Sequence, residues 1–136
     1  MSDESVQQKP KVMLVEDNPD VMSVLAGLMS LSGMEPVKAR TAAESLDIMQ
    51  QDGIQAAVIN GKIALEKGGL LISRLKQVNP DTRIVVVVDG ESDRSRLLRL
   101  GCEDFARLPI SAQTIIEKVM MLLARKNMAE PTGLSS

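Results

Sequence analysis

The sequence predicts an α/β fold in which a parallel five-stranded sheet lies between two layers of helices. Five short apolar runs alternate along the chain with five stretches of helical periodicity, the pattern of repeated strand–helix units. The apolar runs are continuous, which is typical of strands that are buried on both faces. A length of 136 residues suits one such domain.

The five predicted strands cover residues 12–15, 35–39, 56–59, 84–88 and 105–108. The second strand contains Pro36, which cannot donate a ladder hydrogen bond, so we place this strand at an edge of the sheet. The fourth strand has five β-branched residues in succession, which is the strongest strand signal in the chain. Pro109 ends the fifth strand.

The five predicted helices are marked by their end signals. Pro19 begins the first, Thr41 and Glu44 form a capping box for the second, and Ser111 caps the last. The third and fourth cover residues 70–78 and 92–100, and the last runs to about Lys126. The residues expected on the buried faces of the first and last helices are Val21, Val24, Leu25, Leu28, Ile115, Ile116, Val119, Met120, Leu122 and Leu123.

These elements place one domain at residues 11–126. Residues 1–10 are polar and end at a proline, and residues 127–136 contain Pro131 and Gly133, so both ends are expected to be disordered tails. Residues 60–69 are expected to form a loop. The residues after the last helix are too few for an output domain, so a stand-alone domain is expected.

Composition excludes several classes of function. The chain has no histidine, so it has no Ser-His triad and no His-ligated zinc. Its one cysteine, Cys102, excludes an intrachain disulfide and a cysteine-cluster metal site. A net charge of −2 argues against nucleic-acid binding, and no apolar run is long enough to span a bilayer. The acidic start is no signal peptide, so a cytoplasmic protein is expected.

Four groups of residues, in order and at nearly the right spacings, resemble the receiver domain of two-component response regulators over residues 11–125. The four groups are residues 12–19 (Val-Met-Leu-Val-Glu-Asp-Asn-Pro), Ala39 with Glu44, Asn79-Pro80, and residues 101–105 (Gly-Cys-Glu-Asp-Phe) before Pro109. The resemblance implies a flavodoxin-like (βα)5 three-layer sandwich with the strand order 2-1-3-4-5. It also implies a site at the carboxyl ends of the strands.

In this family an acidic pair after the first strand binds Mg²⁺, and an aspartate after the third strand accepts a phosphoryl group. A hydroxyl after the fourth strand and a lysine after the fifth hold the phosphoryl oxygens, and an aromatic residue on the fifth strand reports the state. The resemblance assigns the acidic pair to Glu16 and Asp17 and the aromatic position to Phe105.

Three positions depart from the family pattern. Asn60 stands where the phosphoryl-accepting aspartate is expected, and Leu108, directly before Pro109, stands where the lysine is expected. The hydroxyl position falls at Val88, or at Asp89 if the strand shifts by one residue. An amide cannot form an acyl phosphate, so we expect a phosphorylation-independent, non-enzymatic pseudo-receiver.

Two interpretations remain open for the residual acidic pair. Glu16, Asp17 and the Asn60 carbonyl form a set of oxygen ligands that binds Mg²⁺ weakly at best, and no other cofactor is expected. Alternatively, the ammonium of Lys62 reaches both carboxylates and takes the place of the metal. The simpler alternative is that Lys62 is a solvated loop residue.

Function is then expected to lie in protein–protein contacts. The resemblance places the interaction face on the fourth helix, fifth strand and fifth helix. Its candidate residues are Arg94, Arg96, Arg99, Glu103, Asp104 and Arg107. The expected partner is a signalling protein, either a histidine kinase or a downstream effector, or a second copy of the chain; an ordinary solvated surface is the alternative.

Two other functions remain possible. A conventional Mg²⁺-dependent receiver would accept the phosphoryl group on Asp17 or Asp89 instead. A small ligand at the strand ends would take the place of phosphate, and a roomy apolar pocket beside Val88 and Leu108 would support that function.

Overall fold

Five parallel strands form one sheet in the order β2-β1-β3-β4-β5, which confirms the predicted order. The computed structural model describes residues 9–51, 53–89 and 94–132, with the side chains at 94 and 126–132 outside that description. The strands are β1 (Lys11–Val15), β2 (Glu35–Ala39), β3 (Ile54–Asn60), β4 (Arg83–Asp89) and β5 (Asp104–Leu108). Strand β2, which contains Pro36, lies at an edge as predicted.

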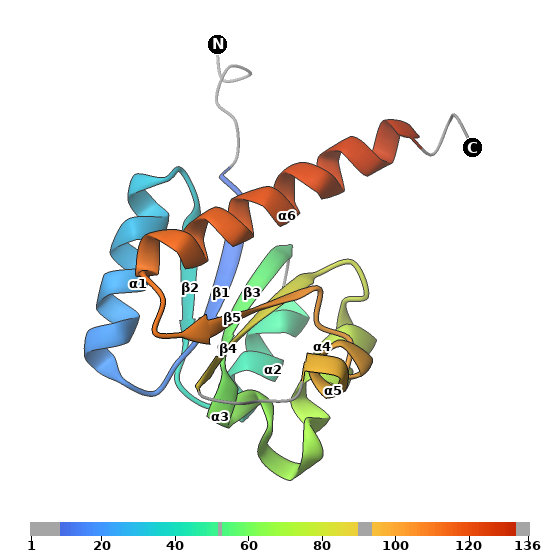
Figure 1. Ribbon diagram of the computed structural model, residues 1–136. Helices are drawn as coiled ribbons and strands as arrows, with labels where there is room; N and C mark the ends of the chain where they lie inside the picture. Colours follow the sequence, from blue (N-terminus) through green and yellow to red (C-terminus); the bar gives the residue numbers. More distant parts are fainter. Residues whose placement is uncertain (1–8, 52, 90–93, 133–136) are drawn as a thin grey trace.

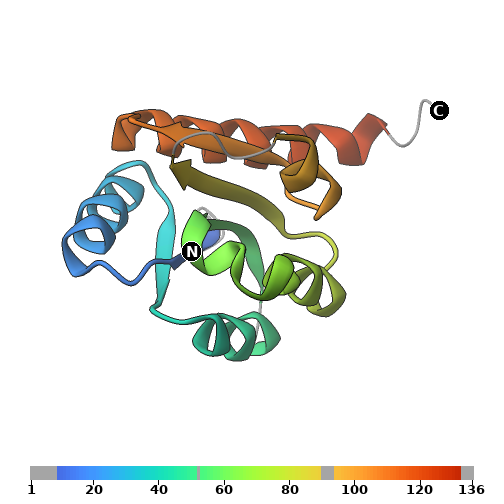
Figure 2. The ribbon, with the colours of Figure 1, turned by 60° about the horizontal axis from the view of Figure 1, so that its bottom comes forward.

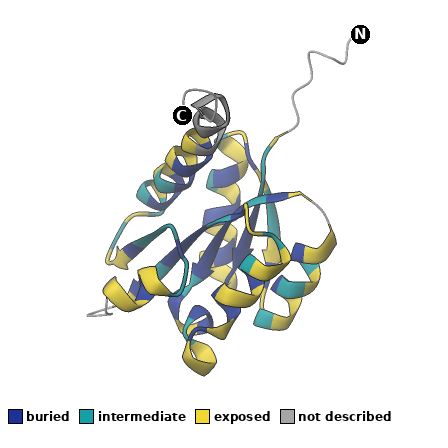
Figure 3. Cartoon of the chain, turned by 90° about the vertical axis from the view of Figure 1, so that its right-hand side faces the viewer, coloured by how far each residue is buried: buried dark blue, intermediate teal, exposed yellow. Residues whose placement is uncertain are grey.

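Helices cover both faces of the sheet (Figures 1 and 2). Helices α1 (Pro19–Leu31) and α6 (Ala112–Thr132) pack on one face. Helices α2 (Ala42–Gln51), α4 (Leu70–Val78) and α5 (Arg94–Arg99) pack on the other. Figure 3 shows the buried residues gathered in the strands and on the inner sides of these helices.

Strand β1 shows why its apolar run is continuous. Val12 and Leu14 are fully buried against α1 and α6, whereas Met13 and Val15 are fully buried on the opposite face. Successive side chains of a strand point to opposite faces, so a strand between two helical layers has no polar face.

Residues 60–69 differ from the predicted loop. They contain the short helix α3 (Gly61–Ala64) and the 3-10 helix η2 (Glu66–Gly68). The Asn60 side chain caps α3, since its Oδ1 accepts the Lys62 N–H at 2.8 Å. Helices this short contain no periodic pattern, so the sequence shows only their caps.

The buried face of α1 was predicted correctly only in part: Leu25 is buried and Leu28 is partly buried as expected, but the other two predicted residues are not. Val21 and Val24 are 41% and 54% exposed, and the residues that face the core are Met22, Leu25, Ala26 and Met29. Both sets have helical spacing, so the pattern alone does not choose between them. The sheet beneath α1 decides which set is buried.

The prediction was also wrong at two places in α6. Met120 is 44% exposed rather than buried. The helix continues past Lys126 to Thr132, so residues 127–132 do not form a disordered tail. Residues 127–130 contain no helix breaker, so the helix ends at the Pro131 and Gly133 signal instead. Over the described part of the chain, no helix combines the length and hydrophobicity needed to cross a bilayer.

Candidate functional site

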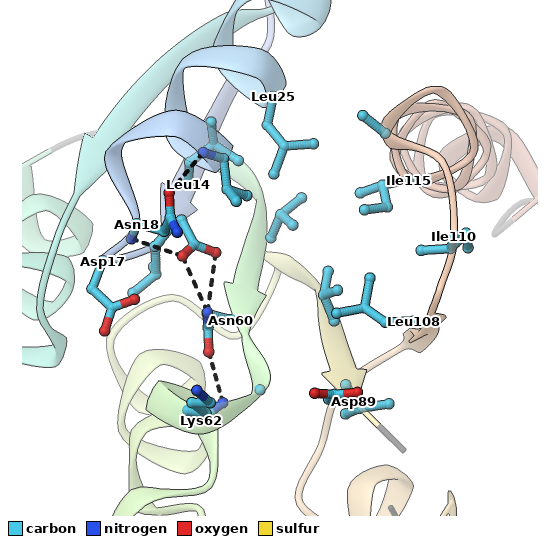
Figure 4. Close-up of a pocket in the computed structure, with 18 of the residues that line it drawn as sticks. Leu14, Asp17, Asn18, Leu25, Asn60, Lys62, Asp89, Leu108, Ile110 and Ile115 are labelled. Atoms are coloured by element: carbon cyan, nitrogen blue, oxygen red, sulfur yellow. Dashed lines mark hydrogen bonds between the residues drawn. The ribbon is translucent and has the colours of Figure 1, made fainter. Parts of the chain in front are cut away.

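The carboxyl ends of the parallel strands meet at one edge of the sheet, where the sequence predicted the site. In the sheet register Asn60 pairs with Val87, and Asp89 pairs with Leu108. Around this edge lies a cavity whose lining includes all the predicted residues of the strand ends (Figure 4). These are Glu16, Asp17, Asn60, Lys62, Val88, Asp89 and Leu108.

A hydrogen-bond network joins Glu16 to Asn60. The Asn60 Nδ2 donates to Glu16 Oε1 at 3.1 Å and to Oε2 at 3.2 Å. The backbone N–H of Asn18 donates to Glu16 Oε2 at 2.9 Å, and Lys62 N–H donates to Asn60 Oδ1. These contacts determine the amide orientation. In the reverse orientation the Asn60 Nδ2 would face the Lys62 N–H, which is also a donor, and the Asn60 Oδ1 would face the Glu16 carboxylate.

The position of Glu16 follows from the elements on either side of it. It comes directly after β1, and it is only 8% exposed. Asn18 caps α1, since its Oδ1 accepts from the N–H groups of Asp20 and Val21 at 2.9 and 3.2 Å. The capping role of Asn18 was not predicted, although an Asn directly before Pro19 at a helix start is a recognisable capping signal.

The Asn60 side chain turns no oxygen toward a Mg²⁺ ion at the acidic pair. Mg²⁺ needs oxygen ligands, but the group of Asn60 that faces Glu16 is the amide nitrogen. The amide oxygen points away from Glu16 and accepts the Lys62 N–H. Within the described residues, no cluster of three or more acidic, cysteine or histidine side chains is placed to hold a metal ion.

Lys62 approaches this network through its backbone rather than its ammonium. Its side chain is exposed. Among the ion pairs of residues that the structure describes, none joins Lys62 to Glu16 or Asp17. The geometry therefore favours the simpler interpretation, in which Lys62 is a solvated residue at the start of α3.

The side chains of Val88, Asp89 and Leu108, at the ends of β4 and β5, contain no hydrogen-bond donor for an anion. Val88 is buried, with 1% of its surface exposed, and packs in the core on the α2 side. Asp89 is exposed at the end of β4. Leu108 is 39% exposed at the end of β5 and contributes an apolar side chain to the cavity.

Phe105 is half-buried on β5 and packs against the core on the α2 side. The guanidinium of Arg107 lies 5.7 Å from the centroid of its ring, which is within the range of a cation–π contact. The aromatic position that the resemblance assigned is therefore occupied on the outer strand, beside the predicted interaction face.

The predicted interaction face divides into two groups. Arg96, Arg99 and Arg107 are exposed on α5 and β5, and the side chain of Arg94 lies outside the described residues. Glu103 and Asp104 are only partly exposed and form ion pairs within the domain. Glu103 accepts the Ile84 N–H at 2.7 Å and pairs with Lys76, and Asp104 pairs with Lys118 at 3.2 Å.

Comparison with known proteins gives one family. Residues 12–120 match the response regulator receiver domain. The chain is 24% identical over 121 residues to the transcriptional regulatory protein CpxR of Escherichia coli (strain K12), covering 88% of this chain and 52% of CpxR. It is 26% identical over 117 residues to the polar-differentiation response regulator DivK of Brucella ovis, covering 82% of this chain and 94% of DivK.

The fold is likewise shared with solved structures. The crystal structure of a response regulator receiver domain protein (CheY-like) from Methanospirillum hungatei JF-1 superposes with a TM-score of 0.80. The two chains are 18% identical, and the alignment covers 90% of this chain and 99% of the other. This likeness concerns the fold. The chain spans about half the length of relatives such as CpxR.

Proposed function

The chain belongs to the response regulator receiver domain family, and from this membership we propose that it is a signalling domain that works without accepting a phosphoryl group. Receiver domains act in signalling and are typically not enzymes. The proposal depends on one observation. Asn60 ends β3, where the resemblance places the phosphoryl-accepting aspartate, and its amide is hydrogen-bonded on both sides.

The chemistry of the neighbouring residues supports the same proposal. An amide offers no nucleophilic carboxylate oxygen, so Asn60 forms no acyl phosphate. Phosphoryl transfer depends on positioned charges and donors. Val88 and Leu108 present only hydrocarbon where the resemblance places a hydroxyl and an ammonium, and Asp89, the alternative hydroxyl position, carries a carboxylate.

Metal binding changes with the loss of the acceptor. Receiver domains typically bind Mg²⁺ at the phosphorylation site, and here the Asn60 amide and the Asn18 N–H satisfy the Glu16 carboxylate. We therefore infer that the domain folds and works without a resident Mg²⁺. A calorimetric titration with MgCl₂ tests this: binding at millimolar concentration that disappears in Asp17→Ala would contradict it.

A second candidate function keeps phosphoryl transfer and moves the acceptor. Asp17 and Asp89 are both exposed and both line the cavity, so either carboxylate is accessible to a small phosphoryl donor. Acetyl phosphate separates the two candidates.

The purified chain is incubated with acetyl phosphate and Mg²⁺, and its intact mass is measured without acid hydrolysis. We expect no mass gain. The matched control is the variant Asn60→Asp/Val88→Thr/Leu108→Lys, which supplies the three missing groups and is expected to gain one phosphoryl group. A gain in the wild-type chain that disappears in Asp17→Asn or Asp89→Asn would refute the proposal, whatever the control variant does.

The output of this domain is proposed to be a protein contact through α5, β5 and α6, within the cytoplasm. Receiver domains interact with kinases and effectors. The exposed Arg96, Arg99 and Arg107 supply positive charge on this face, which suits an acidic surface of a signalling protein or of a second copy.

Sedimentation velocity over a range of concentrations distinguishes these partners. If the contact is between two copies, the variant Arg99→Glu/Arg107→Glu shifts the chain to monomer, and Arg40→Glu at the opposite edge of the sheet does not. If the wild-type chain is monomeric, the same two variants are compared for binding to the kinases and effectors of the source cell. Equal binding by both variants would refute the assignment of this face.

A further inference from the structure

A cavity of about 680 Å³ opens at the carboxyl edge of the sheet, between α1 and the segment that leads from β5 into α6. Its volume lies within the range of about 300 to 1,000 Å³ that is typical of small-molecule sites in proteins. Figure 4 shows its two sides. Asn18, Leu25 and Asn60 lie on one, and Leu108, Ile110 and Ile115 lie on the other.

The apolar part of the cavity lining includes side chains that remain exposed. Val21 and Val24 on α1 are 41% and 54% exposed, and Leu108 on β5 is 39% exposed. All three line the cavity together with Ile110 and Ile115. Exposed apolar side chains scattered singly need no explanation, but a set gathered around one hollow marks a surface that an apolar ligand would cover.

The polar rim determines the charge of that ligand. Among the lining residues that the structure describes, four carry a carboxylate (Glu16, Asp17, Asp20 and Asp89) and one, Lys62, carries an ammonium. Glu16 is satisfied by its network with Asn60 and Asn18. Asp17, Asp20 and Asp89 are exposed, and no ion pair between described residues involves them.

We propose that this cavity binds a small organic cation, a protonated amine with an aliphatic or aromatic body. The body would pack between Val21 and Val24 on one side and Leu108 and Ile110 on the other, and the ammonium would lie at the acidic rim. An anion of the same size would meet the repulsion of the carboxylates. This site goes beyond the proposed signalling role. It rests on the shape and charge of the cavity, and not on whether the chain accepts a phosphoryl group.

Three probes with one body and different head groups test the charge preference. Tryptamine, tryptophol and indole-3-propionate share an indole ring and carry an ammonium, a hydroxyl and a carboxylate. The chain has no Trp and no Tyr, so the indole emission comes from the probe alone and its anisotropy reports binding. We expect tryptamine to bind with a Kd below about 1 mM and at least about tenfold more tightly than indole-3-propionate.

Two substitutions locate the binding in the cavity. Leu108→Lys and Val24→Lys each place an ammonium in the cavity at a partly exposed position. Each is expected to weaken tryptamine binding by at least about tenfold. Val78→Lys is the matched control, because Val78 is also 39% exposed but lies at the end of α4 and does not line the cavity. It is expected to leave the Kd unchanged.

Three results would overturn the proposal. The first is the absence of tryptamine binding below about 1 mM. The second is binding of tryptophol or indole-3-propionate that is as tight as that of tryptamine. The third is a tryptamine Kd that is the same in wild type, Leu108→Lys and Val24→Lys, each shown to be folded by its amide NMR spectrum.

Discussion

Replacing Asn60 by Asp tests the central contact of the site. In the wild-type chain the Asn60 amide donates to both oxygens of Glu16, at 3.1 and 3.2 Å, and Glu16 is 8% exposed. The substitution Asn60→Asp changes almost no volume. It replaces a donor with a second carboxylate, which faces a carboxylate that is already largely buried.

The distances set the size of the effect. At 3.1 to 3.2 Å, two unit charges repel by about 5 kcal/mol at an effective dielectric constant of about 20. The lost hydrogen bonds to a charged acceptor add about 1.5 to 3 kcal/mol. Rotation of the new carboxylate toward solvent relieves most of the repulsion but does not restore the hydrogen bonds, so we expect a net loss of about 2 to 4 kcal/mol of unfolding free energy near neutral pH.

Urea denaturation followed by circular dichroism measures this loss of unfolding free energy. Repeating the measurement at several pH values shows whether the loss grows or shrinks with pH. Repulsion raises the pKa of the introduced carboxyl above its unfolded value, so the folded state binds this proton more tightly than the unfolded state. The destabilisation is therefore largest at neutral pH and fades as the pH falls toward about 4, the ordinary range of an aspartic acid. Wild type and Asn60→Asp are expected to converge there.

Magnesium supplies a second, independent measurement. In the Asn60→Asp variant three carboxylates meet at the strand ends, so Mg²⁺ is expected to restore stability, by about 2.7 kcal/mol at a hundredfold excess over its Kd. The wild-type chain is expected to gain nothing. Gln113→Glu, the same change from amide to carboxylate at an exposed position on α6, is the control and stays within about 0.5 kcal/mol of wild type. An Asn60→Asp variant as stable as this control at neutral pH without Mg²⁺ would refute the reasoning.

Three further predictions concern the scaffold. A Cβ added at Gly61 would lie 2.6 Å from the backbone oxygen of Val87, so Gly61→Ala is expected to cost about 1 to 3 kcal/mol in urea denaturation, and an unchanged midpoint would contradict this close approach. Burial, and secondarily the charge of Glu103, raises the pKa of the Cys102 thiol from 9.0 to about 11. Cys102 in the native chain should therefore react with a thiol reagent far more slowly than in the unfolded chain, and equal labelling rates would refute this. The stability that the protonated thiol contributes is fully present below the pKa of the unfolded chain and should be lost as the pH rises toward 11. Glu103→Ala removes a backbone acceptor and the partner of Lys76, so a loss of about 1 to 3 kcal/mol is expected, and a loss no larger than that of an exposed alanine substitution would show that the contact is dispensable.

The strands could be predicted because their signals are local or follow from a simple constraint, whereas their order was implied by the resemblance to the receiver domain family. The run at residues 12–15 is apolar at every position because the helical layers cover both faces of β1. Pro36 lacks an N–H, which limits it to an edge strand. The strand order then brings Glu16, Asn60 and Leu108 to the same edge of the sheet.

Other features depended on contacts that the sequence pattern does not contain. The two possible buried faces of α1 have the same periodicity, and only packing on the sheet left Val21 and Val24 exposed beside a cavity. Likewise, the sequence placed an amide at position 60, but it did not show which end of that amide faces Glu16.

The sequence alone therefore determined which chemical groups are present at the strand ends and which are missing, because those groups are properties of single residues. The tertiary structure decided what the remaining groups do: the Asn60 amide satisfies the Glu16 carboxylate, and the apolar side chains of α1 and β5 surround a cavity. The physical reason is that a hydrogen bond or a cavity depends on the distance and orientation between segments far apart in the chain, which residue types and spacing do not specify.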